Sequence, residues 1–299
     1  MKLSPEDQAA LDAARDLSAT TRRPTVPALE ERMLLPIPCL DHGFVRLVDY
    51  MGDDGAIVQA ARVSYGRGTR AVSDDRGLIR YLMRHRHTTP FEMCELKLHV
   101  KLPMFVARQW IRHRMANVNE YSARYSVLDS EFYIPRPEEL ARQAKDNRQG
   151  RGELLDPVAA ARALELLKRD AGQAFASYGE LLDEHGLARE LARIGLPLSA
   201  YTQWYWKIDL HNLLHFLSLR LDSHAQHEIR VFAEAIGQIV ADWVPVAWEA
   251  FQDYRVGGVG LSRQALEVVR RRLRGEAVTQ QDSGLSAREW RELQAVLEA

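Results

Sequence analysis

The sequence is poor in cysteine and contains no long hydrophobic run. Only Cys39 and Cys94 occur among its 299 residues, too few for the disulfide framework of a secreted scaffold. No stretch reaches the roughly 18 consecutive apolar residues of a membrane span, and the first ten residues lack the apolar run of a secretory signal. These absences predict a cytoplasmic protein with no membrane partner.

An excess of charge of one sign is also absent. Lys and Arg number 40 against 41 for Asp and Glu, which leaves a formal net charge of −1 and no overall attraction to nucleic acid. Neither Gly66-Arg67-Gly68 nor Gly257-Gly258-Val259-Gly260 has the glycine spacing of a dinucleotide fingerprint, and no phosphate loop with Gly-Lys-Ser or Gly-Lys-Thr is present. We therefore expect no nucleic-acid partner and no phosphate site of these glycine-rich kinds.

Basic side chains do gather in one place, the segment 109–125. Four of them lie there among amides, a serine and a glutamate: Arg112, His113, Arg114 and Arg124. An arginine can give two parallel charge-assisted hydrogen bonds to phosphate oxygens. The segment therefore predicts a pocket for a phosphorylated ligand with a polar head. A solvated basic strip is the alternative, and the apolar residues Trp110 and Ile111 within the run argue against it.

Hydrophobic periodicity predicts both strands and helices. We expect strands over 44–51, 92–101 and 201–208. Helical spacing of apolar residues and capping signals predict helices over 6–17, 53–63, 75–87 and 156–184. Asp209 would cap a further helix. Two more helices are expected in the tail, and the last of them begins with a capping box at Ser286. Pro103 suits the first position of a further helix, which would carry Arg108 and Arg112 on one face.

Several short motifs, taken in order, resemble those of the flavin-dependent thymidylate synthases. Arg112-His113-Arg114 is followed after seven residues by Ser122, and the pattern continues as Ser122-x-Arg124-Tyr125-Ser126. The other matching motifs are Ala61-Arg62-Val63-Ser64-Tyr65, His87-Thr88-Thr89-Pro90-Phe91-Glu92, Arg193-Ile194-Gly195-Leu196-Pro197 and Leu219-Arg220-Leu221-Asp222-Ser223-His224-Ala225-Gln226. The resemblance covers roughly residues 40–254 in one collinear order, which is far more specific than one motif alone.

The expected fold is α+β, with mixed helices around a central, mostly antiparallel sheet. Residues 1–36, polar and punctuated by proline, would form an N-terminal arm. By the resemblance, residues 37–254 would form a single catalytic domain, and residues 255–299 a C-terminal helical extension.

The resemblance implies a binding site for deoxyuridylate (dUMP). Arg220 would be the catalytic residue, because a guanidinium against the uracil carbonyl and N3 stabilises the negative charge that forms when the ring ionises. An Arg220 that merely pairs with Asp222 or Glu228 is the alternative. Ser122 would be a hydrogen-bond donor to the phosphate rather than a nucleophile. The implied dUMP contacts are Gln109, Trp110, Ile111, Arg112, Glu120, Tyr121, Ser122, Ala123, Arg124, Arg193 and Arg220.

The resemblance also implies FAD, which would carry the hydride chemistry. Its implied contacts are Ser64, Thr89, Glu92, Arg112, His113, Arg114, Glu120, Asp209, Leu210, His211 and His215. Asparagine and arginine are frequent in the family at the positions of Asp209 and His211, so it stays open whether side chain or backbone meets the flavin there. His87 resembles a histidine on the folate side of the family's site, and a plain histidine at a helix C-terminus is the alternative.

The activity implied is methylation of dUMP to thymidylate (dTMP), with methylenetetrahydrofolate as carbon donor and NADPH as reductant. The family's sites lie between subunits, so the resemblance also implies a homotetramer with active sites at subunit interfaces. Neither cysteine lies in a Pro-Cys-His-like context, so a flavin route explains the chain better than a cysteine nucleophile does.

Parts of the sequence also suggest two other functions. His211 and His215 share a helix face, with His224 and His227 close behind, a spacing that suits a metal hydrolase, but no HExxH arrangement is present and we predict no metal. A nucleic-acid-binding module would use the arginines and nearby aromatic rings for stacking. The neutral total charge argues against it.

Overall fold

The computed structural model describes residues 5–63, 75–125, 127–144 and 150–298. The chain divides into two compact units, Met1–Glu249 and Ala250–Ala299. Every residue that the sequence assigns to a ligand belongs to the first unit.

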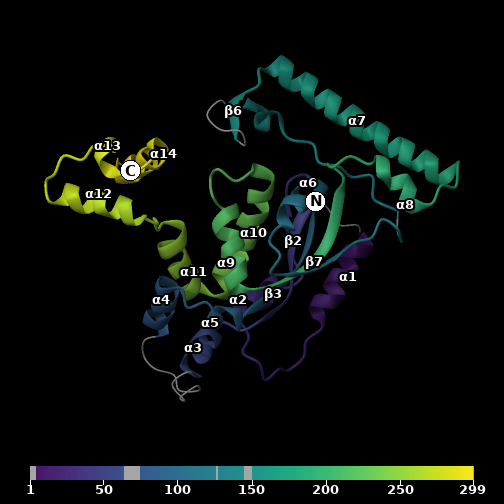
Figure 1. The fold of residues 1–299 in the computed structure, drawn as a ribbon. Helices are drawn as coiled ribbons and strands as arrows, with labels where there is room; N and C mark the ends of the chain where they lie inside the picture. The colour runs from purple at the N-terminus through teal and green to yellow at the C-terminus, as the bar shows by residue number, and fades with distance from the viewer. Residues whose placement is uncertain (1–4, 64–74, 126, 145–149, 299) are drawn as a thin grey trace. The chain divides into compact units, whose positions relative to one another are not determined.

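A five-stranded sheet runs through the first unit (Figure 1). Its strands are β1 (Pro36–Cys39), β2 (Gly43–Met51), β3 (Glu95–Pro103), β4 (Asn117–Glu120) and β7 (Tyr201–Asp209). They lie in the order β1-β2-β3-β7-β4, and every neighbouring pair is antiparallel. Together with the surrounding helices, this sheet confirms the predicted α+β class.

Helices make up most of the remaining first unit. They are α1 (Pro5–Asp16), α2 (Pro27–Arg32), α3 (Asp54–Arg62), α4 (Asp75–His85), α5 (Thr89–Glu92), α6 (Met104–Trp110), α7 (Pro157–Asp183), α8 (Arg189–Ala192), α9 (Leu210–Arg220), α10 (His227–Trp243) and α11 (Pro245–Phe251), the last of which contains the boundary between the units. Three begin where the sequence predicts, because an aspartate side chain accepts a backbone N–H of the first turn: Asp53 before α3, Asp156 before α7 and Asp209 before α9.

The sheet presents one buried and one polar face. Along β3, Leu96, Leu98 and Val100 are fully buried, whereas the residues between them are only partly buried. Opposite them on β7, Trp204 and Trp206 are buried on the same face. Helices α6, α9 and α10 pack against this side of the sheet. The predicted alternation of the strand is confirmed from Glu95 to Val100, and the more exposed face carries Lys97 and His99. Lys101, which the alternation would place on that face, is instead buried and pairs with Glu131.

Two boundaries differ from the expectation. Glu92 ends the short helix α5 instead of starting a strand, because the buried Phe91 turns the chain there and its carbonyl accepts the N–H of Cys94. Pro103 is the N-cap of α6, not its first residue, and the helix ends at Trp110. Arg112 therefore lies beyond α6, and the expectation that it shares a helix face with Arg108 was wrong.

Several short elements have no counterpart in the prediction. They are β1, β4, the hairpin of β5 (Ala141–Gln143) and β6 (Arg151–Leu154), the helix α2, and the 3-10 turns η2 (Pro137–Glu139) and η3 (Arg193–Gly195). Each has three to six residues, too short for hydrophobic periodicity to develop.

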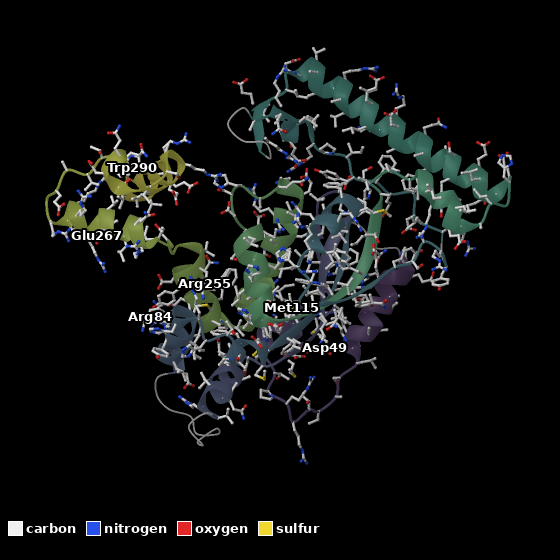
Figure 2. All side chains as sticks on the ribbon, viewed as in Figure 1. Asp49, Arg84, Met115, Arg255, Glu267 and Trp290 are labelled. Carbon is white, nitrogen blue, oxygen red and sulfur yellow. The ribbon has the colours of Figure 1, made fainter. Side chains whose placement is uncertain are left out.

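The second unit is helical and has a core of its own. It contains η4 (Gln252–Val256), α12 (Arg263–Leu273), α13 (Gln280–Ser283) and α14 (Ala287–Glu298). Val268, Leu285 and Leu293 are buried together, and Trp290, labelled in Figure 2, packs against them. Ser286 and Glu289 form the predicted capping box. No helix within the described ranges of the chain is long and apolar enough to cross a membrane.

Candidate active site

Trp110 fixes the point at which the basic segment leaves the core. Its side chain is fully buried, with its ring centroid 5.1 Å from Trp206 and 4.7 Å from Phe216. Such an anchor holds the end of α6 against both the sheet and α9, so the residues that follow emerge at a fixed place. Because the indole lies in the core, any contact of Trp110 with a ligand would have to come from its main chain.

The turn after α6 meets the end of α9 around the pair formed by His113 and Arg220. Arg220, the last residue of α9, donates a hydrogen bond from Nε to Nε2 of His113 over 3.1 Å. The His113 ring also lies edge-on to Phe216, with centroids 5.0 Å apart, and 6.1 Å from the ring of His215. The structure thus brings together three of the residues that the sequence assigns to the flavin or the nucleotide.

The surroundings of this pair keep the imidazole neutral. Burial, followed by the positive groups of Arg220, His215 and Arg112, lowers the pKa of His113 from 6.5 to about 4. A neutral ring can accept the Arg220 hydrogen bond at Nε2, whereas a protonated ring cannot. Burial and the nearby Arg112 also lower the pKa of Arg220 from its ordinary value.

Arg220 has no carboxylate partner among the residues that the structure describes. The two acids that the sequence offers are engaged elsewhere, because Asp222 pairs with His224 and Glu228 accepts from Arg151 and Gln226. A half-buried guanidinium without a counter-ion is costly. The arrangement fits an arginine kept for an anionic ligand rather than for an internal ion pair.

A second group of residues forms the loop after β4. The N–H of Tyr125 bonds to the carbonyl of Ser122 at 3.0 Å, and the N–H of Arg124 bonds to the Ser122 Oγ at 3.3 Å. Helix α8 holds this turn from the side, since Arg189 donates to the Tyr125 carbonyl at 2.7 Å and Glu190 lies 3.6 Å from Arg124. Ala123 is buried below the turn and Arg124 is exposed.

The remaining assigned nucleotide residues lie near these two groups in the sequence. Gln109, on α6, has a buried Oε1 with no hydrogen-bond partner in the described part of the chain, a state that costs stability unless a water or ligand donates to it. Ile111 and Tyr121 are exposed, and Arg193, in η3 directly after α8, is partly buried. Glu120 accepts from the Thr202 hydroxyl at 2.8 Å.

Thr202 and Arg189 are positioning residues that sequence reasoning missed. Thr202 is a buried hydroxyl on β7, and Arg189 precedes the Arg193 motif by one helical turn. Neither has a sequence signal of its own, because each acts through a residue that is distant along the chain.

A third group lies where α5 packs against α9. It contains Thr89 and Glu92 on one side and Asp209, Leu210 and His211 on the other. The buried Leu210 donates its N–H to the Cys94 carbonyl at 2.8 Å, which ties the two elements together. Both Asp209 carboxylate oxygens are engaged by Asn212, at 2.9 Å from its N–H and 2.7 Å from its side-chain amide.

A cavity of about 1120 Å³ opens beside Thr89. Ala56, Ala60 and Ala61 of α3 line one side of it, and Tyr81 and His87 line the other. His87 is exposed at the cavity, two residues past the end of α4. Ser64, assigned to the flavin, falls outside the described residues.

The donor set suits a flavin and an anionic nucleotide. Arg112 and Arg114 are exposed beside a neutral imidazole that accepts hydrogen bonds, and the alanine-lined cavity offers an apolar surface next to the Thr89 hydroxyl. Among the described residues, no group of three or more His, Cys, Asp or Glu side chains is arranged to hold a metal ion. His224 and His227 instead lie beside Asp222 and Glu139.

Comparison with known proteins gives consistent matches. A family model described as "Thymidylate synthase complementing protein" matches residues 46–246. The flavin-dependent thymidylate synthase of Ruegeria pomeroyi is 63% identical over 300 residues, which cover 99% of this chain and 99% of that protein. The enzyme of the same name from Gluconobacter oxydans is 62% identical over 300 residues, which cover 100% of this chain and 99% of that protein.

A solved structure extends the likeness to three dimensions. The UMP/dUMP methylase PolB from Streptomyces cacaoi, bound with 5-Br dUMP, superposes with a TM-score of 0.66 at 36% identity. The match covers 73% of this chain and 98% of that chain.

Proposed function

The chain belongs to the flavin-dependent thymidylate synthase family, and from this membership we propose that it methylates dUMP to dTMP with a bound flavin. The names of the similar proteins and the bound ligand of the Streptomyces methylase support this substrate. The observation that carries the proposal is Arg220, half-buried, held by a neutral His113 and without a carboxylate partner in the described residues.

Arg220 activates the uracil ring in this proposal. Its Nε is taken by His113, so its two terminal nitrogens remain for the uracil carbonyl and N3. Negative charge develops at those atoms when the ring ionises, and a guanidinium already held in place stabilises it without reorganisation. His113 is therefore a positioning residue for Arg220.

The nucleotide phosphate is bound by the Ser122 turn. Ser122 donates its hydroxyl, the backbone at Ala123 contributes through its N–H, and Arg124 gives charge-assisted hydrogen bonds. Arg112 and Arg193 add positive charge, and Gln109 and Tyr121 orient the ring and sugar. The unpartnered buried Oε1 of Gln109 supports this role, because a donor on the nucleotide would satisfy it.

We assign the flavin as FAD. FAD supplies the hydride chemistry when bound. Its candidate contacts are Ser64, Thr89, Glu92, Arg112, His113, Arg114, Glu120, Asp209, Leu210, His211 and His215. The Asp209 carboxylate is occupied by its own helix cap, which favours a backbone contact at this end.

The co-substrates are methylenetetrahydrofolate as carbon donor and NADPH as reductant. His87 lies at the cavity beside Thr89, so it is the candidate residue on the folate side. A flat pterin ring suits the apolar and aromatic walls of that cavity.

The active enzyme is a cytoplasmic homotetramer with sites at subunit interfaces. The assigned residues lie in three groups of one chain, at the His113 and Arg220 pair, at the Ser122 turn, and at the junction of α5 with α9. Assembly of subunits would complete each site with residues from different copies. Sedimentation of the purified protein tests this, and a monomer at assay concentration would contradict it.

One experiment tests the function directly. Purified protein is loaded with FAD, its visible spectrum is recorded with and without dUMP, and dTMP is quantified after addition of methylenetetrahydrofolate and NADPH. We expect flavin absorption that dUMP perturbs, and dTMP only when all components are present. A colourless protein that takes up no FAD supplied in excess would disprove the proposal.

A further inference from the structure

The cavity beside Thr89 has a basic rim, of which the proposed function uses only His87. Arg84, His85, Arg86 and His87 follow one another at the end of α4, all four are exposed, and Arg86 and His87 line the cavity. Figure 2 labels Arg84 at this end of α4. The two arginines give this end of α4, next to the cavity, a local positive field.

The arginines of this rim lack acidic partners. Neither Arg84 nor Arg86 forms an ion pair with a carboxylate of the described residues. Arg84 instead lies 5.9 Å above the ring of Tyr81, with its Nε 3.4 Å from His85. Earlier on the same helix, Arg76 and Arg80 both pair with Glu249. The pairing of the helix arginines with internal acids thus stops where the cavity begins.

The wall next to the rim is aromatic. Tyr81 is 44% exposed, the ring of His85 lies 4.3 Å from it, and the ring of His87 meets it edge-on at 5.7 Å. Ala56, Ala60 and Ala61 contribute small side chains to the lining, beside Gln59 and Val63. A planar ring fits between a methyl surface and aromatic groups.

Arg86 adopts a backbone conformation that favours glycine. Its φ is +59°, and the N–H groups of Arg86 and His87 bond back to the carbonyls of Met83 and Leu82, which closes the end of α4. A non-glycine residue in this left-handed region costs roughly 1 kcal/mol. An arginine at this position projects a cation at the cavity edge despite that cost.

We propose that Arg84 and Arg86 bind the carboxylates of an oligoglutamate tail on the folate co-substrate, whose ring end lies beside Tyr81 and His87. The inference rests on the proposed function, because that function brings a folate to the cavity. A tail of successive glutamates carries single negative charges spaced along a flexible chain, which suits separate, exposed arginines on a rim.

A phosphate group fits this rim less well. The cations surround the C-terminus of α4, where the N–H groups of Arg86 and His87 are already bonded to helix carbonyls and so are not free for a phosphate. Phosphate sites in proteins generally use the N-terminus of a helix and backbone N–H groups that converge on one point. The experiments must therefore distinguish a glutamate tail bound at this rim from two alternative ligands, the flavin pyrophosphate and the 2′-phosphate of NADPH.

Binding is measured on the FAD-loaded protein by calorimetry, with p-aminobenzoyl-monoglutamate and p-aminobenzoyl-pentaglutamate as probes. We expect the pentaglutamate to bind about tenfold tighter or more, since each charge-assisted contact contributes on that order, and to lose more affinity with added salt. In the double variant Arg84→Gln with Arg86→Gly this preference falls to about one. Glycine relaxes the backbone at position 86, so the variant keeps its helix end.

Kinetics give the second readout. The KM for pentaglutamyl methylenetetrahydrofolate rises in the double variant, while kcat and the KM for the monoglutamyl form stay unchanged. Arg86→Lys retains part of the preference, because it keeps the charge. Lys168→Gln, which removes one positive charge from an exposed site on α7, leaves the preference at the wild-type value.

Three results would overturn the inference. They are equal binding of the two probes by the wild-type protein, loss of FAD from Arg86→Gly, and a change in the KM for NADPH alone. Failure of the proposed function looks different, since no dTMP would then form with a folate of either tail length. The calorimetric comparison still decides the role of the rim in that case.

Discussion

Arg220 and His113 are joined by a 3.1 Å hydrogen bond that links the end of α9 to the turn after α6. The bond requires an unprotonated Nε2 on His113, and the depressed pKa of the ring provides it. Positive charge is thus concentrated on the arginine, and the histidine holds that arginine without neutralising it.

Replacing Arg220 tests its role in the reaction. Arg220→Ala removes the guanidinium that we assign to the ionised uracil, so we expect the rate of dTMP formation to fall about 100-fold to 1,000-fold, with most of the FAD retained. Leu219→Ala, at an exposed neighbouring position, serves as the control and keeps full activity. Wild-type turnover in Arg220→Ala would remove the residue from the mechanism.

His113 should titrate far below an ordinary histidine. We expect an NMR midpoint near pH 4, and a higher midpoint in Arg220→Gln, which deletes one of the positive groups that lower the pKa. Because the folded pKa lies below the unfolded value of 6.5, the unfolded chain binds more protons between about pH 4 and 6.5. Part of the folding stability is therefore lost as the pH falls through this window, and His113→Asn should lose less. A midpoint near 6.5 would contradict the buried, arginine-flanked ring.

Replacing Ser122 tests nucleotide binding separately from flavin binding. Ser122→Ala deletes the hydroxyl that we assign to the phosphate, so we expect dUMP to bind about tenfold more weakly, as for a lost hydrogen bond to a charged group. Flavin content, read from the visible spectrum, should stay the same. Ser130→Ala, on an exposed serine of the same loop, provides the matched control. Unchanged dUMP affinity would move the phosphate away from this turn.

Trp110 should matter mainly for stability. Trp110→Ala empties a site packed by Trp206 and Phe216, which typically costs about 3–5 kcal/mol in the free energy of unfolding. Met115, labelled in Figure 2, is 70% exposed, and Met115→Ala should cost less than about 0.5 kcal/mol. Urea denaturation followed by circular dichroism measures both. A cost for Trp110→Ala as small as that of the control would show that the indole is not an anchor.

Substitutions of Asp209 test whether the flavin contacts the backbone or the side chain of this residue. Asp209→Asn keeps a cap acceptor and should retain FAD, whereas Asp209→Ala should lower stability by about 1 kcal/mol through loss of the cap. Thermal unfolding and flavin content are measured on both variants. If Asp209→Asn folds normally but loses FAD, the carboxylate itself binds the flavin.

Several long, regular elements could be predicted from the sequence, although the helix α10 (His227–Trp243) was not among them. The strand at 44–51, the helix that Asp156 caps and the helix that Asp209 caps follow from local patterns, and the structure confirms them. The two faces of β3 from Glu95 to Val100 follow likewise from alternation. In these segments the residues that decide the structure are neighbours in the chain.

Features set by distant partners could not be predicted. Residues 117–120 become a strand because residues 204–207 lie opposite them, and no local signal marks that pairing. The same pairing draws the chain away from α6 after Trp110, so Arg112 leaves the helix. For the proposed site, motif order predicted a set of residues but not their division into three groups, which depends on how α5, α8 and α9 pack.

The pairing of β4 with β7 also determines when this region can fold during translation. As the polypeptide leaves the ribosome from its N-terminus, the arginine cluster emerges long before residues 201–209 exist to hold it. The turn at Ser122, which we assign to the phosphate, can acquire its final form only after some eighty further residues have been translated. A nascent chain stalled within α7 would thus carry all the arginines of the basic segment and still be unable to recognise a nucleotide.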